Sequence, residues 1–136
     1  MKKNNTEEKL EIHFTKDLKD KERATFETGI KLGALYHILC GIPINTNENV
    51  IKSIENGIEQ AISCQPYVKS VKINLRRENL KGIKENEYDY DEISGKTIEA
   101  DLVVQFKNIE VKAKIKWINE LEYPLMYISE LKVLEK

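Results

Sequence analysis

The sequence predicts an α+β domain in which two helices pack on one face of a four-stranded, mainly antiparallel sheet. Apolar residues recur first at helical spacing, in two segments before residue 65, and then alternate with polar residues at the spacing of a strand. The chain has 136 residues, enough for one sizeable core and too few for two. We therefore expect one domain over residues 17–136, preceded by a charged, mobile lead-in over residues 1–16.

The first predicted helix is capped by Asp17 or Asp20 and runs to about Cys40, where Gly41 and then Pro43 end it. Apolar residues surround this helix. One stripe comprises Phe26, Ile30, Gly33 and His37, and the opposite side comprises Leu32, Leu35 and Leu39. A helix that is apolar on more than one side needs a second cover, and in a domain this small we expect another copy of the chain to provide it.

The second predicted helix follows a cap at Thr46 or Asn47 and ends near Cys64, because Pro66 forces Gln65 into an extended turn. Its single apolar face comprises Val50, Ile51, Ile54, Ile58, Ala61 and Ile62. The period then changes from helix to strand. Alternation of Val71, Ile73 and Leu75 with polar residues predicts a half-buried strand.

Residues 78–95 show neither period and predict a long loop. Two alternating segments on either side of a two-residue turn then predict a hairpin that pairs Phe106 with Ile109 and places Asp101 opposite Lys114. A last strand runs from about residue 125 to residue 133. Its apolar residues change phase part-way, so we expect a β-bulge near Ser129 or the residue after it.

Composition excludes several classes of partner and compartment. The formal net charge is -1, which does not suit a surface that binds nucleic-acid phosphates. No apolar run is long enough to span a bilayer, and the first residues do not form a secretory signal, so we expect a cytoplasmic protein without a membrane partner. Cys40 and Cys64 are the only cysteines, and we expect them to be reduced and buried.

Motifs for metal and nucleotide chemistry are absent from the sequence. The two histidines and two cysteines lack the spacings of an ordinary zinc site, and there is no glycine-rich phosphate loop. We therefore expect neither a metal nor a cofactor.

A few polar residues stand where polarity is costly. Glu27 lies among apolar neighbours on the first helix, and it is either paired with Lys31 one turn later or kept for the N–H donors of a ligand. His37 is either a satisfied core histidine or a group that transfers protons. Gln65 and Tyr123 each precede a proline in a turn, where they are either ordinary turn residues or ligand contacts.

Four segments carry a resemblance to a known family. They are ERATFETGIKLGALYHILCGIP from residue 22, AISCQPYV from residue 61, YDEISG from residue 90 and ELEYPLMYI from residue 120. In this order they resemble the archaeal dihydroneopterin aldolases of the methanopterin pathway. The chain departs from that pattern at Ile38 and Leu39, where the family has a glutamine and an aromatic residue.

The resemblance implies a homotetramer with its sites at subunit contacts, and cleavage of 7,8-dihydroneopterin without metal or Schiff base. It implies that Glu27 accepts two hydrogen bonds from the amino-pyrimidinone edge of the pterin, and that His37 and Tyr123 handle protons. Gln65 would bind the polar rim of the heterocycle, with Gly33 and Tyr36 also in contact with the substrate. A noncatalytic pterin or purine binder built on the same assembly is the alternative.

Overall fold

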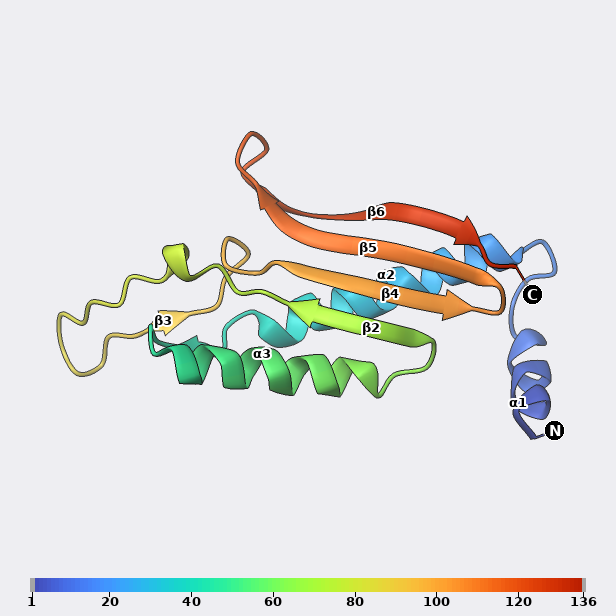
Figure 1. The fold of residues 1–136 in the computed structure, drawn as a ribbon, viewed down its shortest axis with the longest axis horizontal. Coiled ribbons are helices and arrows are strands. Elements are labelled where there is room, and N and C mark those ends of the chain that lie inside the picture. The colour runs from blue at the N-terminus through green and yellow to red at the C-terminus, as the bar shows by residue number, and fades with distance from the viewer. Residues whose placement is uncertain (1, 136) are drawn as a thin grey trace.

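The structure, a computed structural model, describes residues 2–135. Its main sheet has four antiparallel strands in the order β2-β4-β5-β6. These strands are β2 (Val68–Ile73), β4 (Ala100–Phe106), β5 (Ile109–Ile118) and β6 (Tyr123–Val133). Two helices, α2 (Asp20–Leu39) and α3 (Glu48–Ser63), lie on one face of this sheet (Figure 1). Helix α2 packs on β4 and β5, and α3 packs on β2, which confirms the predicted α+β architecture.

The predicted lead-in contains a helix. Helix α1 (Lys2–Glu11) lies at the end of the domain where the chain begins, and the Glu7 carboxylate accepts a hydrogen bond from the Tyr67 hydroxyl at 2.5 Å. This segment lacks an apolar period, but Glu, Lys and Leu favour helices without one. The mobility of the lead-in stays a prediction, and Met1 and Lys136 lie outside the described residues.

The ends of α2 differ in how well the sequence anticipates them. Lys19, not Asp17 or Asp20, occupies the N-cap position, and its N–H donates to the Glu22 carboxylate at 2.7 Å. The carboxylate therefore satisfies a backbone donor from inside the helix, not from the cap. At the other end, Gly41 has a φ of 90°, which confirms it as the residue that ends the helix.

Helix α3 also closes one edge of the sheet. Asn47 caps it as predicted, by accepting a hydrogen bond from the N–H of residue 49 at 2.9 Å. Further along, Glu59 accepts from the N–H of Ile73 and Glu55 accepts from the N–H of Leu75, both at 2.7 Å. These are donors on the outer side of β2, so side chains occupy the positions where another strand would pair.

The predicted loop over residues 78–95 contains regular structure that the sequence did not reveal. Strand β3 (Asp91–Glu92) pairs with β1 (Pro43–Ile44) in a separate two-stranded sheet, and η1 (Arg77–Asn79) is a short 3₁₀ turn. Two residues are too few to show a period of two, so alternation could not detect these strands.

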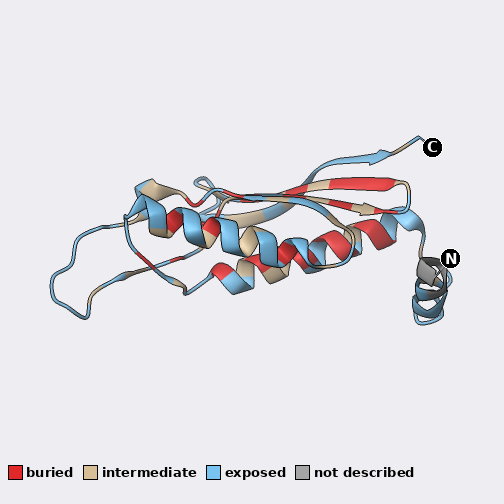
Figure 2. Cartoon of the chain, turned by 60° about the horizontal axis from the view of Figure 1, so that its bottom comes forward, coloured by how far each residue is buried: buried red, intermediate tan, exposed pale blue. Residues whose placement is uncertain are grey.

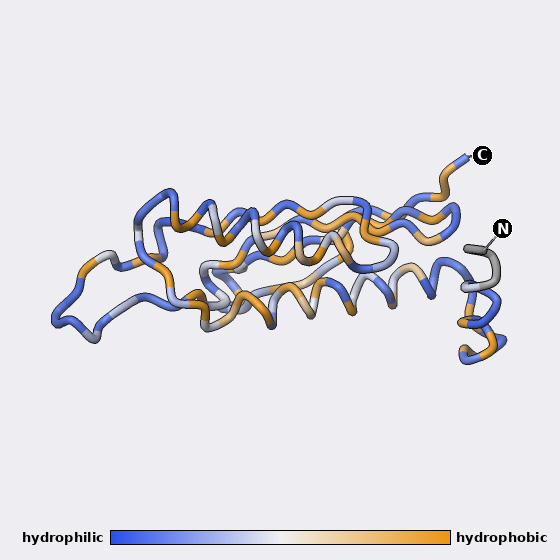
Figure 3. The backbone as a smooth tube through the Cα atoms, turned by 90° about the horizontal axis from the view of Figure 1, so that it is seen from below, coloured by the Kyte–Doolittle hydropathy of each residue, from blue (hydrophilic) through white to orange (hydrophobic). Residues whose placement is uncertain are grey.

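The predicted hairpin and bulge are confirmed. Phe106 pairs with Ile109, and Asp101 lies opposite Lys114 and forms an ion pair with it. The register of β6 against β5 shifts at Ser129, where the change of phase predicts the bulge. Figure 3 shows polar and apolar residues alternating along these strands.

The core lies between the helices and the sheet, but it leaves one apolar strip uncovered. Residues of β6 that lie opposite buried apolar residues of β5 share the helix-covered face of the sheet. Four of them remain exposed, namely Met126, Ile128, Leu131 and Val133. Phe26 and Ile30 on the outer side of α2 are 56% and 47% exposed. In Figure 2, the strand that leads to the C-terminus is coloured mainly as exposed, whereas buried residues appear in the helices and in other strands of the sheet.

Two sequence interpretations change with the structure. Cys40 and Cys64 are exposed, free thiols, because each occupies the C-cap of a helix, where the chain turns away from the core. His37 is exposed too, and it is therefore not a core histidine of this chain. None of the helices within residues 2–135 is long and apolar enough to cross a bilayer.

Substitution by alanine should have opposite effects on the free energy of unfolding at Gly57 and at Gly82. A Cβ added at Gly57, within α3, would meet nothing within 4 Å, so Gly57→Ala should raise the free energy of unfolding by about 0.5–1 kcal/mol. Gly82 has a φ of 72°, and its added Cβ would lie 2.8 Å from Cγ2 of Thr46. Gly82→Ala should therefore lower that free energy by about 1 kcal/mol or more, measured by urea unfolding. Equal shifts in both variants would contradict this account of the two sites.

Candidate functional site

Glu27 lies in a buried row of charges on α2. Its Oε1 accepts a hydrogen bond from Nζ of Lys31 at 2.5 Å, and its Oε2 accepts one from Nε of Arg23 at 3.0 Å. The three residues are 7%, 4% and 5% exposed, respectively. Of the two alternatives for Glu27, the pairing with Lys31 is therefore the one found in the single chain, and the carboxylate is not left without a counter-charge. Residues four apart meet on one face of a helix, which explains the row.

The charges of this row determine the protonation of Glu27. Burial by itself raises the pKa of the carboxyl group, but hydrogen bonds from Lys31 and Arg23, together with their positive charges, hold the pKa below its usual range. The side chain is therefore ionised at neutral pH and can act only as a hydrogen-bond acceptor.

Tyr67 covers this row of charges. Its hydroxyl accepts from Nη2 of Arg23 at 3.3 Å and donates to Glu7, and its ring centroid lies 5.5 Å from Nζ of Lys31. Burial and the hydrogen bond to Glu7 raise the pKa of Tyr67 to about 12. Tyr67 was not among the predicted site residues, although it directly follows the Gln65-Pro66 turn.

Tyr67 has a backbone conformation that is rare for its residue type. Its φ is 70°, a left-handed value that costs a non-glycine residue about 1 kcal/mol or more. Such strain often occurs at ligand sites, so it adds a second reason to include Tyr67 in the candidate site.

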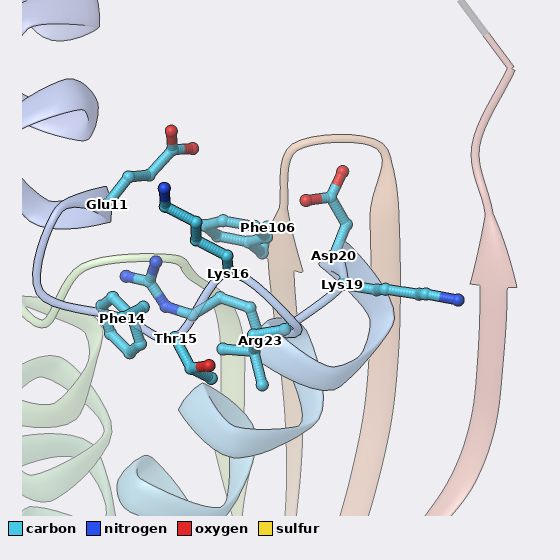
Figure 4. A pocket seen from close by; sticks show the side chains of 9 residues that line it. Glu11, Phe14, Thr15, Lys16, Lys19, Asp20, Arg23 and Phe106 are labelled. Atoms are coloured by element: carbon cyan, nitrogen blue, oxygen red, sulfur yellow. The ribbon is translucent and has the colours of Figure 1, made fainter.

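An open cavity of about 300 Å³ adjoins the row at Arg23 (Figure 4). The guanidinium of Arg23 lies 4.1 Å from the ring centroid of Phe14 and 4.7 Å from that of Phe106. Glu11, Lys16 and other polar side chains of the α1–α2 connection line the outer part of the cavity. The two rings provide flat contacts for the guanidinium, which helps to explain how an arginine can be buried here.

A second group of predicted site residues lies near the other end of α2. Tyr36 is close to Tyr123, the first residue of β6, and to the Cys40 thiol. Burial first, and then these two neighbours, raise the pKa of Tyr36. An added Cβ at Gly95 would lie 2.9 Å from the Tyr36 hydroxyl and 3.1 Å from Cγ of Pro124, so only glycine fits between them.

The predicted site residues therefore fall into two groups within one chain. Glu27 and His37 are ten positions apart on α2, which corresponds to about 15 Å along the helix axis. Gln65 lies two residues before Tyr67, in the turn between α3 and β2, and is partly buried. Gly33 lies between the two groups, and an added Cβ there would meet nothing within 4 Å, so the space beside the helix is open.

Comparison with known proteins identifies the family of this chain. The family model described as dihydroneopterin aldolase matches residues 19–129. The chain belongs to the dihydroneopterin aldolase family. A curated dihydroneopterin aldolase from Methanopyrus kandleri is 37% identical over 92% of this chain and 100% of its own length. Another from Picrophilus torridus is 35% identical over 82% of this chain and 89% of its own length.

Solved structures support the same relationship for the fold. A crystal structure of a protein from Picrophilus torridus matches with a TM-score of 0.74 and 31% identity, and it covers 92% of this chain and 95% of that one. The family match includes Glu27, His37, Gln65 and Tyr123. Both groups of candidate residues thus lie within the part of the chain that is shared with dihydroneopterin aldolases.

Within residues 2–135, no three His, Cys, Asp or Glu side chains come together closely enough to hold a metal ion. Glu27 has cationic partners, and Glu55 and Glu59 are used by backbone donors. These three carboxylates are therefore already bound to protein partners.

The charge row predicts a pH-dependent contribution to stability. Because the pKa of Glu27 is lowered in the folded state, its stabilisation is fully present above its unfolded pKa of about 4.3 and is lost as the pH falls through the folded value. Glu27→Gln should lower the free energy of unfolding by at least about 2 kcal/mol at pH 7, because it leaves two buried cations without a counter-charge.

The deficit should shrink below about pH 4, since a protonated glutamic acid is nearly isosteric with glutamine. Denaturant unfolding of both proteins from pH 3 to pH 7 measures this difference. Glu120→Gln, at an exposed position, should match the wild type at every pH. A Glu27→Gln deficit that stays constant over the whole range would contradict the assignment.

Proposed function

We propose that this protein is a dihydroneopterin aldolase that cleaves 7,8-dihydroneopterin into 6-hydroxymethyl-7,8-dihydropterin and glycolaldehyde. The family match over residues 19–129 carries the proposal. The alignment with the Methanopyrus kandleri relative spans 92% of this chain and all of that protein, and the alignment with the Picrophilus torridus relative spans 82% and 89%. Because the related proteins are archaeal and the resemblance is to enzymes of methanopterin synthesis, we assign the reaction to that pathway.

The proposed reaction is a retro-aldol cleavage that needs no metal and no Schiff base. A base removes the proton of the side-chain hydroxyl on C2′, and the bond between C1′ and C2′ breaks as the C2′–O carbonyl of glycolaldehyde forms. The electrons of the broken bond enter the conjugated C=N bond of the dihydropterin ring, and an acid then returns a proton to C1′. The substrate therefore supplies the electron sink, and the protein supplies orientation and proton transfer.

The proposed roles follow the two groups of residues. Glu27 holds the amino-pyrimidinone edge of the ring through two charge-assisted hydrogen bonds, for which its ionised state is suited. His37 and Tyr123 exchange protons with the side chain of the substrate. Both are exposed in this chain, so neither is blocked by a neighbour in its own subunit. Gln65 binds the polar rim of the heterocycle.

The distance between the groups supports a site that two subunits complete. About 15 Å along α2 is longer than a pterin ring, so Glu27 and His37 of one chain do not hold the same heterocycle. The exposed strip of β6 and the exposed side of α2 also require a cover. We infer that copies assemble through these surfaces into a homotetramer, in which Gly33 and Tyr36 of one copy face the substrate.

A noncatalytic pterin or purine binder is the second candidate. The observation in its favour is the distance of about 15 Å along α2 between Glu27 and His37. Because of this distance, the buried carboxylate is sufficient to bind a ring without any proton transfer. Turnover distinguishes the two functions.

The first prediction concerns turnover. The protein should release glycolaldehyde and 6-hydroxymethyl-7,8-dihydropterin in equal amounts from 7,8-dihydroneopterin, in the presence of EDTA and without added metal. Borohydride added together with the substrate should not inactivate it, because no lysine imine forms. Chromatography of the pterins and an aldehyde assay measure both products. Binding without product above the blank would leave the noncatalytic binder.

The second prediction concerns the proton-handling residues. His37→Asn and Tyr123→Phe should each lower kcat by about 10²–10⁴-fold, with KM changed only a few-fold, because general acid–base catalysis contributes about that much. Each variant should also lose one limb of the pH–rate profile. Tyr88→Phe, in the exposed loop, is the control and should keep full activity. A kcat within about threefold of wild type in both variants would remove these residues from the mechanism.

A further inference from the structure

Lys31 has more donors than its recorded partners use. It is 4% exposed, and among residues 2–135 its ammonium makes one hydrogen bond, to Oε1 of Glu27 at 2.5 Å. An ammonium group carries three N–H donors and no acceptor. One further interaction is recorded for it, with the ring of Tyr67, whose centroid lies 5.5 Å from Nζ.

Neutralisation of Glu27 alone does not account for Lys31. Arg23 already donates to Oε2 of the same carboxylate at 3.0 Å, so one negative charge faces two buried cations. A second buried cation costs desolvation energy that an already paired carboxylate does not fully recover. The surplus donor is therefore suited to an acceptor that the single chain does not contain.

The amino-pyrimidinone edge of a pterin contains such an acceptor. This edge presents the 2-amino N–H, the N3–H and the 4-carbonyl oxygen side by side. Glu27 and Lys31 present two carboxylate oxygens followed by an ammonium. Two donors and one acceptor on the ligand therefore meet two acceptors and one donor on the protein, in the same order.

We propose that Lys31 is a specificity-determining residue that donates a hydrogen bond to the 4-carbonyl oxygen of the pterin while it remains bonded to Glu27. Glu27 and Lys31 then contact the heterocycle at three points, and Arg23 holds the carboxylate in place through its own hydrogen bond. This inference rests on the proposed pterin site, and it adds to that site the reason for selecting a 4-oxo ring.

Glu27 and Lys31 become accessible to a ligand when the side chain of Tyr67 moves. The ring of Tyr67 lies over Lys31, and its hydroxyl is held by Arg23 and by Glu7 of α1. Its left-handed φ of 70° is a strained conformation that the surrounding contacts hold in place, so a ligand that reaches Lys31 must replace these contacts.

A pair of ligands that differ at one atom tests the inference. Pterin and 2-amino-4-thioxopteridine keep the same two N–H donors, but sulfur is a weaker hydrogen-bond acceptor than oxygen. Neither is cleaved, so equilibrium dissociation constants follow from fluorescence or calorimetry. Wild-type protein should bind pterin at least about fivefold more tightly, and in Lys31→Met the two constants should agree within about twofold.

The control is Lys52→Met, at an exposed lysine on α3, which should keep the wild-type ratio. If circular dichroism shows that Lys31→Met does not fold, Lys31→Gln replaces it and should lower the ratio at least about threefold. Equal affinities in the wild type, or an unchanged ratio in the Lys31 variant, would overturn the role of Lys31 and leave the aldolase proposal in place. If the wild type binds neither ligand, the pterin site itself is wrong and this inference fails with it.

Discussion

The ion pairs of Glu27 with Arg23 and Lys31 are the interaction on which the rest of the candidate site depends. They keep a carboxylate ionised inside the domain, although burial alone favours its neutral form. They also tie three turns of α2 to the turn after α3, because Arg23 reaches the Tyr67 hydroxyl. A charge held in this way is rigid, and rigidity is what a carboxylate needs to bind a flat ligand in one orientation.

Within one subunit, the two groups of candidate residues are held apart by helix α2. The charges lie towards the beginning of α2, whereas Tyr36, His37 and Tyr123 lie near its end and at the start of β6. A straight helix fixes the distance between the two groups, and no rotation of side chains closes about 15 Å. A second subunit is the simplest way to bring complementary groups together, which is why the assembly and the reaction belong to one proposal.

Much of the fold was predictable from local patterns, and most of the site was not. Alternation gave the hairpin register and the bulge at Ser129, and Gly41 marked the end of α2, because these features depend on neighbours in sequence. Strands β1 and β3 were not predicted, because a strand of two residues is too short to show an alternating pattern. The spacing of Glu27 and Lys31 suggested their pairing, but Tyr67 enters the cluster through the packing of α3 and β2. No local pattern contains that contact.

The two edges of the sheet show why one side of the domain is suited to a partner. On β2, the outward N–H groups of Ile73 and Leu75 bind Glu59 and Glu55, so an added strand would have to displace two carboxylates. Within residues 2–135, no strand pairs with the outer edge of β6, and no carboxylate accepts from its outward N–H groups. The apolar face of β6 continues the buried face of β5. Tyr123 begins this strand, and α2 packs on the neighbouring strands β4 and β5. A copy that covered β6 would therefore bury the apolar strip and meet Tyr123 at the same contact, whereas a copy at β2 would do neither.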